Sequence, residues 1–204
     1  QRDVTELGDA STNSKIRTYV YPLTATVKDD AGRPLTNMYV KVIDVSTLGQ
    51  LVSAANKTGA DGSAQVVDMR ISKYSSGVMS QVPATSYYYY VYDQSGALVA
   101  LGKFEIQRGA SVPSTGYNVV ATVRYATEIP VKNSATRGYL LIKGVEFLNG
   151  TKKDVKVPFT ISGGAMTLQG KVPVSVEYPV DIYVTHVTLG GQEVPVKGGQ
   201  FLVF

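Results

Sequence analysis

Apolar residues recur at every second position through much of this 204-residue chain, and this period constrains its fold more than any other feature. In one extended segment Leu23, Ala25 and Val27 share one face, whereas Thr24 and Thr26 share the other. Side chains alternate in this way in β-strands that bury one face. Asp- and Gly-rich turns separate the alternating runs at short intervals. The pattern predicts an all-β protein made of antiparallel β-sandwiches.

The spacing of polar segments indicates two modules in tandem. We expect an N-terminal extension over residues 1–18, a β-sandwich over 19–125, a linker over 126–138 and a second, smaller β-sandwich over 139–204. The linker is inferred from its polar cluster and from Pro130 and Gly138. A single larger sandwich with both halves interleaved is the alternative.

One stretch carries a family resemblance. It consists of Val27–Leu35 with its Asp-Asp-Ala-Gly turn, the strand Val40–Val42, and the Thr58–Gly62 turn before Ala64 and Val66. These residues resemble immunoglobulin-like and carboxypeptidase-regulatory-like modules of microbial surface proteins. The resemblance implies an immunoglobulin-like β-sandwich outside the cell and transfers no catalytic or binding residue. In overall style the chain also resembles subunits of archaeal extracellular filaments and surface layers.

The inventory of reactive side chains is small, and we expect no enzyme. The chain has no cysteine and one histidine, which excludes thiolate chemistry and multi-histidine metal sites. His186 lies in an apolar alternating run, where a hydrogen-bonded core or interface imidazole is expected rather than a catalytic base. Asp29, Asp30 and Asp61 fit turn positions, and Ca²⁺ bound by them is the alternative. We therefore expect no cofactor, with calcium left open.

Charge, hydropathy and short motifs bear on partners and compartment. The net charge of +4 comes from scattered Lys and Arg residues, so nucleic acid is not expected as a partner. No apolar run approaches the ~20 residues that span a bilayer. We interpret the start at Gln1 as that of a secreted chain whose signal peptide was removed. Two N-glycosylation sequons begin at Asn56 and Asn149 and fit an extracellular protein.

The segment 87–92 contains five tyrosines and places aromatic rings on both faces of a strand. Because a sandwich strand needs one apolar face, we predict that at least one of Tyr88, Tyr90 and Tyr92 is buried by a second surface, other than the core of its own sheet. That surface can be covered by the chain itself, by a neighbouring molecule, or by a glycan stacked on exposed rings.

The N-terminal extension is the second candidate for an assembly contact. Its few large apolar residues, Val4, Leu7 and Ile16, are too few to anchor it by burial. We expect the extension to pair its backbone with an open sheet edge of another copy. Pro158, Pro173 and Pro195 suggest that the second module has interrupted or protected strand edges of this kind.

Taken together, these features favour an extracellular structural subunit that self-assembles into a filament or surface layer. Strand donation or end-to-end packing of sandwiches would hold the polymer together. The alternative is a glycan-binding or adhesin module of a cell-surface protein.

Overall fold

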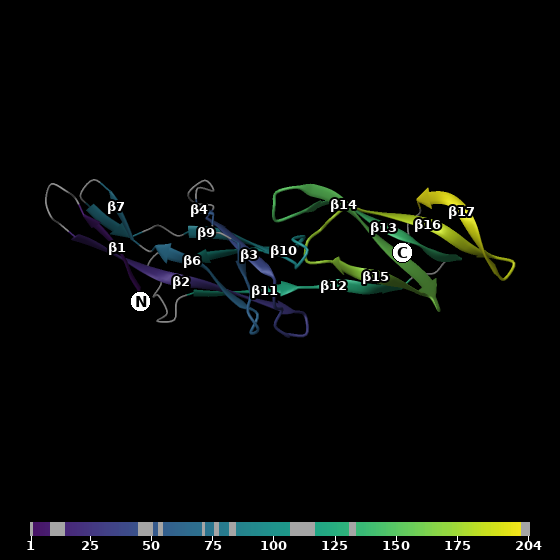
Figure 1. Ribbon diagram of the computed structural model, residues 1–204, viewed down its shortest axis with the longest axis horizontal. Helices are drawn as coiled ribbons and strands as arrows, with labels where there is room; N and C mark the ends of the chain where they lie inside the picture. Colours follow the sequence, from purple (N-terminus) through teal and green to yellow (C-terminus); the bar gives the residue numbers. More distant parts are fainter. Residues whose placement is uncertain are drawn as a thin grey trace. The chain divides into compact units, whose positions relative to one another are not determined.

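The computed structural model is all β: every regular element in the residues that it describes is a strand (Figure 1). Its backbone description covers residues 2–8, 15–44, 51–52, 55–70, 72–75, 78–81, 85–106, 117–130 and 134–200. Side chains are described for residues 23–43, 55–66, 86–105, 117–129 and 134–197. The strand pairs whose registers are described are all antiparallel, which confirms the fold class expected from the period-two pattern.

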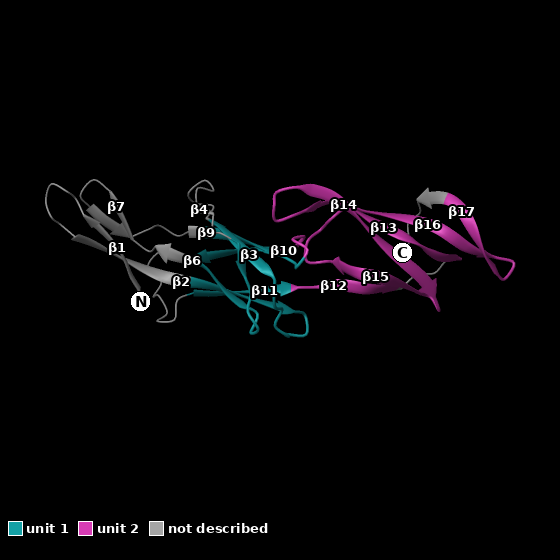
Figure 2. Ribbon diagram, in the orientation of Figure 1, with its two compact units in different colours: residues 1–94, 101–122 teal, residues 95–100, 123–204 magenta. Residues whose placement is uncertain are grey.

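The chain forms two compact units, coloured separately in Figure 2. Unit 1 contains residues 1–94 and 101–122, and unit 2 contains residues 95–100 and 123–204. The backbone therefore passes between the units three times, after Gln94, Ala100 and Thr122.

Unit 1 is built from two main sheets. One contains β1 (Arg2–Gly8), β2 (Lys15–Asp29), β6 (Ser63–Arg70) and β11 (Tyr117–Val123). The other contains β10 (Leu98–Ile106), β9 (Thr85–Tyr92), β3 (Tyr39–Asp44), β4 (Leu51–Val52) and β5 (Asn56–Lys57). The first three residues of β10 are assigned to unit 2, and the strand belongs to unit 1 from Leu101 on. A separate hairpin consists of β7 (Ser72–Ser75) and β8 (Val78–Gln81). Both main sheets supply fully buried side chains, including Leu23 and Val27 from β2 and Val40 from β3.

Unit 2 is organised around one six-stranded sheet. In order across the sheet the strands are β12 (Tyr125–Pro130), β15 (Ala165–Pro173), β14 (Lys152–Ser162), β13 (Ala135–Glu146), β16 (Val180–Leu189) and β17 (Gln192–Gln200). Its core contains Phe159, Met166, Leu140, Ile142, Val145, Val157, Leu168 and Val172. Leu98 and Val99 are also buried, and β-bridges join Ala97 to Phe147 and Ala100 to Ser175.

The range 126–138, expected as a linker, differs in the structure. Most of it lies in β12 and β13, and the change of unit comes earlier, after Thr122. Ile129 packs against the core and Ala135 is 6% exposed. In this range the alternation of apolar residues favours strands more than the polar cluster and Pro130 favour a loop, and Pro130 is the last residue of β12. The segment 95–100, which no sequence signal assigned to unit 2, completes that unit.

The prolines of unit 2 occupy positions where a ladder is missing on one side. Pro195 lies in the edge strand β17, and Pro173 ends β15. Pro158 lies within the central strand β14, which differs from the expected edge or strand start. There it pairs with Tyr139 of β13, while the β14–β15 ladder begins only at Phe159. Pro158 therefore occupies a local edge, where its missing N–H costs no ladder hydrogen bond.

Candidate interaction surface

Strand β9 separates two sets of side chains that alternate along it. In the antiparallel ladder with β3, Val91 pairs with Val40 and Tyr89 with Val42, and Val40, Val42 and Val91 are at most 2% exposed. The intervening pairs are Tyr88 with Ile43, Tyr90 with Lys41 and Tyr92 with Tyr39. Because side chains alternate across a strand, these pairs lie on the opposite, outer side of the sheet.

The inner side of β9 is closed by close packing with β10. Tyr87 stacks on Phe104 with ring centroids 5.0 Å apart. A side chain at Gly102 would overlap the hydroxyl and ring of Tyr89, so glycine leaves the space that this ring fills. Burial disfavours the phenolate and raises the pKa of Tyr89 above its ordinary value of 10.0.

The outer side is a band of tyrosines and charged residues, which we call the tyrosine face. Since Gly102 and Phe104 point inward, the residues beside them on β10 point outward. The face contains Tyr39, Lys41 and Ile43 from β3, Tyr88, Tyr90 and Tyr92 from β9, and Leu101, Lys103 and Glu105 from β10.

Exposure on this face changes steadily along β9. Tyr92 is 3% exposed, Tyr90 is half-buried, and Tyr88 is 36% exposed. On β10, Leu101 is 47% exposed. The end of the face near Tyr88 and Leu101 therefore leaves apolar area open to solvent within one copy of the chain.

Charged side chains border this open end. The Lys103 ammonium lies 2.8 Å from Glu105 Oε1, which also accepts a hydrogen bond from the Ser86 hydroxyl at 3.2 Å. The hydrogen bond with Lys103 and that from Ser86 hold the pKa of Glu105 below its ordinary value, and Glu105 raises the pKa of Lys103. The face thus carries both signs of charge beside its aromatic rings.

A polar hollow of about 260 Å³ adjoins the other end of the face, near Tyr39. It is lined by Asn37, Tyr39, Lys57 and Gln94. The Lys57 ammonium lies 5.3 Å from the centre of the Tyr39 ring, within cation–π range. Asn37 has φ 57°, and it is the one non-glycine residue with positive φ among those the structure describes.

Thr58 holds the loop that carries Asn37. Its hydroxyl donates to the Leu35 carbonyl at 2.7 Å and accepts from the Met38 amide at 3.0 Å. The Asn37 amide donates to the Thr58 carbonyl at 3.0 Å. Sequence reasoning missed both Asn37 and Thr58 as parts of a site. Tyr39 could have been found from the sequence. It is adjacent to the buried Val40, as Tyr92 is adjacent to the buried Val91, so both tyrosines point to the outer side of the sheet.

The N-terminal residues lie differently from the expectation of contact with another copy. β1 pairs antiparallel with β2 of its own chain, with Leu7 opposite Ile16 and Arg2 opposite Val20. The extension is therefore part of a hairpin within the chain. The side chains of Val4, Leu7 and Ile16 are outside the described residues, so their role as assembly contacts stays a prediction.

The two sequons occupy different environments. Asn149 lies exposed in the turn between β13 and β14. Asn56 is half-buried in β5, opposite Val40 of β3.

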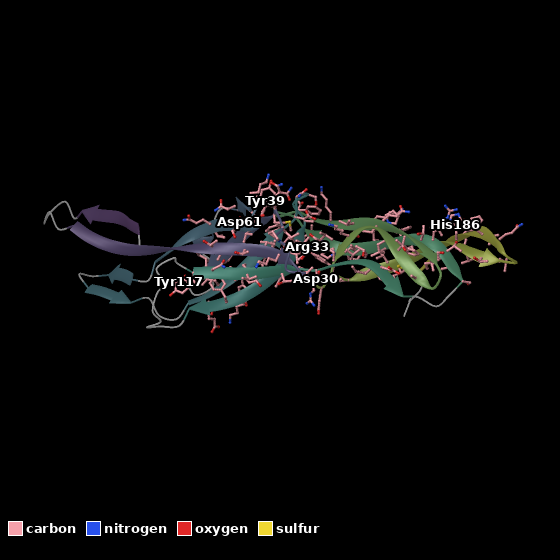
Figure 3. All side chains as sticks on the ribbon, turned by 90° about the horizontal axis from the view of Figure 1, so that it is seen from below. Asp30, Arg33, Tyr39, Asp61, Tyr117 and His186 are labelled. Carbon is pink, nitrogen blue, oxygen red and sulfur yellow. The ribbon has the colours of Figure 1, made fainter. Side chains whose placement is uncertain are left out.

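The residues considered for metal binding or catalysis mostly serve local structure (Figure 3). Asp29 accepts a hydrogen bond from the Arg33 amide, pairs with the Arg33 side chain and accepts a further hydrogen bond from the Ala31 amide, which together hold its pKa below its ordinary value. Asp61 Oδ1 accepts from the Ser63 amide. In the described part of the chain, no group of three or more His, Cys, Asp or Glu side chains could hold a metal ion, and this includes groups around Asp30. His186 is half-buried, and its Nδ1 lies 2.9 Å from the Thr185 hydroxyl.

Comparisons with known proteins leave the family open. No family model matches the chain, and no curated protein matches it significantly. Among solved structures, the chain is similar to the shaft pilin SpaA from Lactobacillus rhamnosus GG. The two share 10% identity at a TM-score of 0.37, over 90% of this chain and 93% of the other. Among the described residues, no helix is long and apolar enough to cross a membrane.

Proposed function

We propose that this chain is an extracellular structural subunit that self-assembles into a filament or surface layer, and that the tyrosine face is a contact between copies. The observation that carries the proposal is the aromatic area left open on this face. The other side of the same sheet is already buried, so folding alone does not require Tyr88 and Tyr90 on the outside. Tyrosine is typical of the buried centre of protein interfaces.

A second copy is the occupant that the charges favour. Lys103 and Glu105 lie on one strand beside exposed Leu101. The same surface of a second copy therefore offers a charge opposite to each of these two and apolar area for Leu101. Unit 2 carries an outer surface of similar composition. There Tyr139 and Tyr183 stack at 5.0 Å, and the Lys156 ammonium lies 3.9 Å from the centre of the Tyr139 ring. Polar, aromatic surfaces of this kind can associate with one another.

Strand donation by residues 1–18 is the finer form of the proposal. Among the described strands, β1 pairs only with β2 and thus forms the edge of its sheet. In an assembly, β1 would leave the β2 of its own chain and occupy the same place in a neighbour, which exchanges equivalent hydrogen bonds. A chain lacking residues 1–15 should then remain monomeric. Normal polymers from the truncated chain would leave the tyrosine face as the contact.

The assembly proposal is tested by comparing two outer-surface variants. The double variant Tyr88→Ser/Tyr90→Ser should lose sedimentable polymers that are visible by electron microscopy, while its thermal unfolding stays close to that of the parent chain. Val120→Ser is the matched control, because Val120 is 52% exposed on β11 in the other sheet of unit 1. Equal polymerisation of both variants would overturn the proposal.

Glycan binding is the second candidate function, and the hollow beside Tyr39 is the observation that favours it. Two amide side chains, an aromatic ring and an ammonium group surround a preformed space, a combination that can hold a saccharide through stacking and hydrogen bonds. Binding to a glycan array that is lost in Asn37→Ala and Gln94→Ala, with polymer formation unchanged, would support this function.

A further inference from the structure

The two sequons of the chain differ in whether the folded protein leaves their asparagine side chain available. A sequon requires an asparagine amide that can receive a sugar and a surface position with room for it. Asn56-Lys57-Thr58 and Asn149-Gly150-Thr151 satisfy the same three-residue pattern. The hydrogen bonds and burial around each asparagine separate them.

Asn149 is exposed at the tip of a hairpin. The turn is closed by the Phe147 amide donating to the Thr151 carbonyl and by the Gly150 amide donating to the Phe147 carbonyl, both at 2.8 Å. Gly150 has φ +83°, and apart from Gly150 and its two chain neighbours no atom lies within 4 Å of the place where a side chain would begin. The space beside this turn can therefore take a bulky group.

The side chain of Asn149 is also held in a suitable orientation. Its Oδ1 accepts hydrogen bonds from the Thr151 amide at 3.0 Å and from the Thr151 hydroxyl at 2.7 Å. Both bonds use the carbonyl oxygen of the side chain. The Nδ2 atom, which a glycan would occupy, donates no hydrogen bond in the described residues.

Asn56 has the opposite arrangement. Its Nδ2 donates to the Gln65 carbonyl at 2.6 Å and lies 3.4 Å from the Val66 carbonyl. The third residue of this sequon, Thr58, is 3% exposed, and its hydroxyl is engaged with Leu35 and Met38. A sugar on Asn56 would displace its bond to β6 and would have to fit at a half-buried strand position.

We propose that Asn149 is an N-glycosylation site of this protein and that Asn56 stays unmodified in the folded chain. The inference rests on the proposed extracellular location. In the transfer, Asn149 Nδ2 forms a bond to the anomeric carbon of a saccharide carried on a polyprenyl pyrophosphate. The bond from that carbon to the pyrophosphate oxygen breaks, the carrier leaves with the electron pair, and one amide proton is lost to a base of the transferring enzyme. The glycan then projects from the β13–β14 hairpin of unit 2.

The test is site mapping on the full chain, secreted from a host that N-glycosylates the three-residue sequon. Peptide mass spectrometry of the folded, protease-resistant fraction should find the saccharide on the peptide containing Asn149 and none on the peptide containing Asn56. Asn149→Gln and Thr151→Ala should each lose that mass, whereas Asn56→Gln should retain it. Modified Asn56, or unmodified Asn149, in the folded fraction would overturn the proposal.

A second measurement tests, without any transferring enzyme, whether each asparagine position can carry a bulky group in the folded chain. Because the chain has no cysteine, Asn149→Cys and Asn56→Cys each introduce one thiol. A polyethylene-glycol maleimide should label Asn149→Cys in the native state without lowering its unfolding temperature. Asn56→Cys should label only on unfolding or lose stability when labelled. Equal native labelling of both variants at unchanged stability would contradict the assignment. If the chain is glycosylated at Asn149 but stays monomeric, the assembly proposal is refuted and the glycosylation proposal stands.

Discussion

The two sides of β9 place the same residue type in opposite roles. Tyr87 is 8% exposed and stacks on Phe104, whereas Tyr88, the next residue, is 36% exposed on the outer side. Both are tyrosines within one strand, so neither composition nor strand propensity separates them. Parity relative to Val91 decides which side of the sheet each ring faces, while burial on the outer side also depends on position along the strand, because Tyr92 there is 3% exposed. The comparison teaches that Tyr87 belongs to the packing of unit 1, whereas Tyr88 leaves part of its ring open to solvent on the outer side.

The largest expected effect comes from placing a carboxylate on each side of β9. Val91→Asp should unfold unit 1, because an unpaired buried charge costs about 3–5 kcal/mol. Tyr88→Asp places the same group on the outer side and should leave the fold intact. Near-ultraviolet circular dichroism and thermal unfolding of both variants measure the difference. Similar losses of stability in both would contradict the division of the strand into two sides.

A smaller effect is expected from filling the space that Gly102 leaves. Gly102→Ala should destabilise unit 1 by about 1–3 kcal/mol, because the added methyl group forces the Tyr89 ring to move. Denaturant unfolding of this variant beside Leu101→Ala, whose site is 47% exposed, gives the matched comparison. A fully stable Gly102→Ala chain would show that the inner packing is loose.

The raised pKa of Tyr89 predicts a further, smaller loss of stability at alkaline pH. Below pH 10 the folded and unfolded states both keep the phenol proton. As the pH rises through 10.0, the unfolded state releases this proton first, so the folded state loses stability until its own pKa is passed. Tyr89→Phe should remove this part of the alkaline decline in unfolding temperature. An unchanged alkaline profile in the variant would exclude Tyr89 as its cause.

The smallest effect is expected at the border of the tyrosine face. The pKa of Glu105 is lowered by Lys103 and Ser86, so its contribution to stability is present above its ordinary value of 4.5 and is lost as the pH falls through the folded-state pKa. Because the pair is exposed, salt should screen most of the effect. Glu105→Gln should flatten the acid dependence of the unfolding temperature slightly at low salt. A larger acid dependence in the variant would contradict this assignment.

The sequence predicted the strands and their faces better than it predicted connections. Alternation around Val91 identified the inner and outer tyrosines because side-chain parity is a local property of a strand. Polar composition and a terminal proline describe a strand edge as well as a loop, and most of residues 126–138 lie in β12 and β13. The joining of Ser95–Ala100 to unit 2 depends on pairing with residues far along the chain, such as Ala97 with Phe147, which no short motif encodes.

The candidate sites show the same limit. The sequons at Asn56 and Asn149 are indistinguishable as motifs, and only the hydrogen bonds to Gln65 and Thr151 separate them. Likewise, the hollow near Tyr39 brings together Asn37, Lys57 and Gln94 from three segments. Sequence spacing gives no reason to join them.

The central claim, that the outer side of β9 is a contact between copies, is tested most directly by the chemical reactivity of Tyr88 before and after assembly. Monomeric and polymeric protein would be nitrated with tetranitromethane, and the modified tyrosines located by peptide mass spectrometry. Tyr88 should react readily in the monomer and become protected in the polymer, while the buried Tyr87 should be protected in both states. Equal reactivity of Tyr88 in monomer and polymer would contradict the claim.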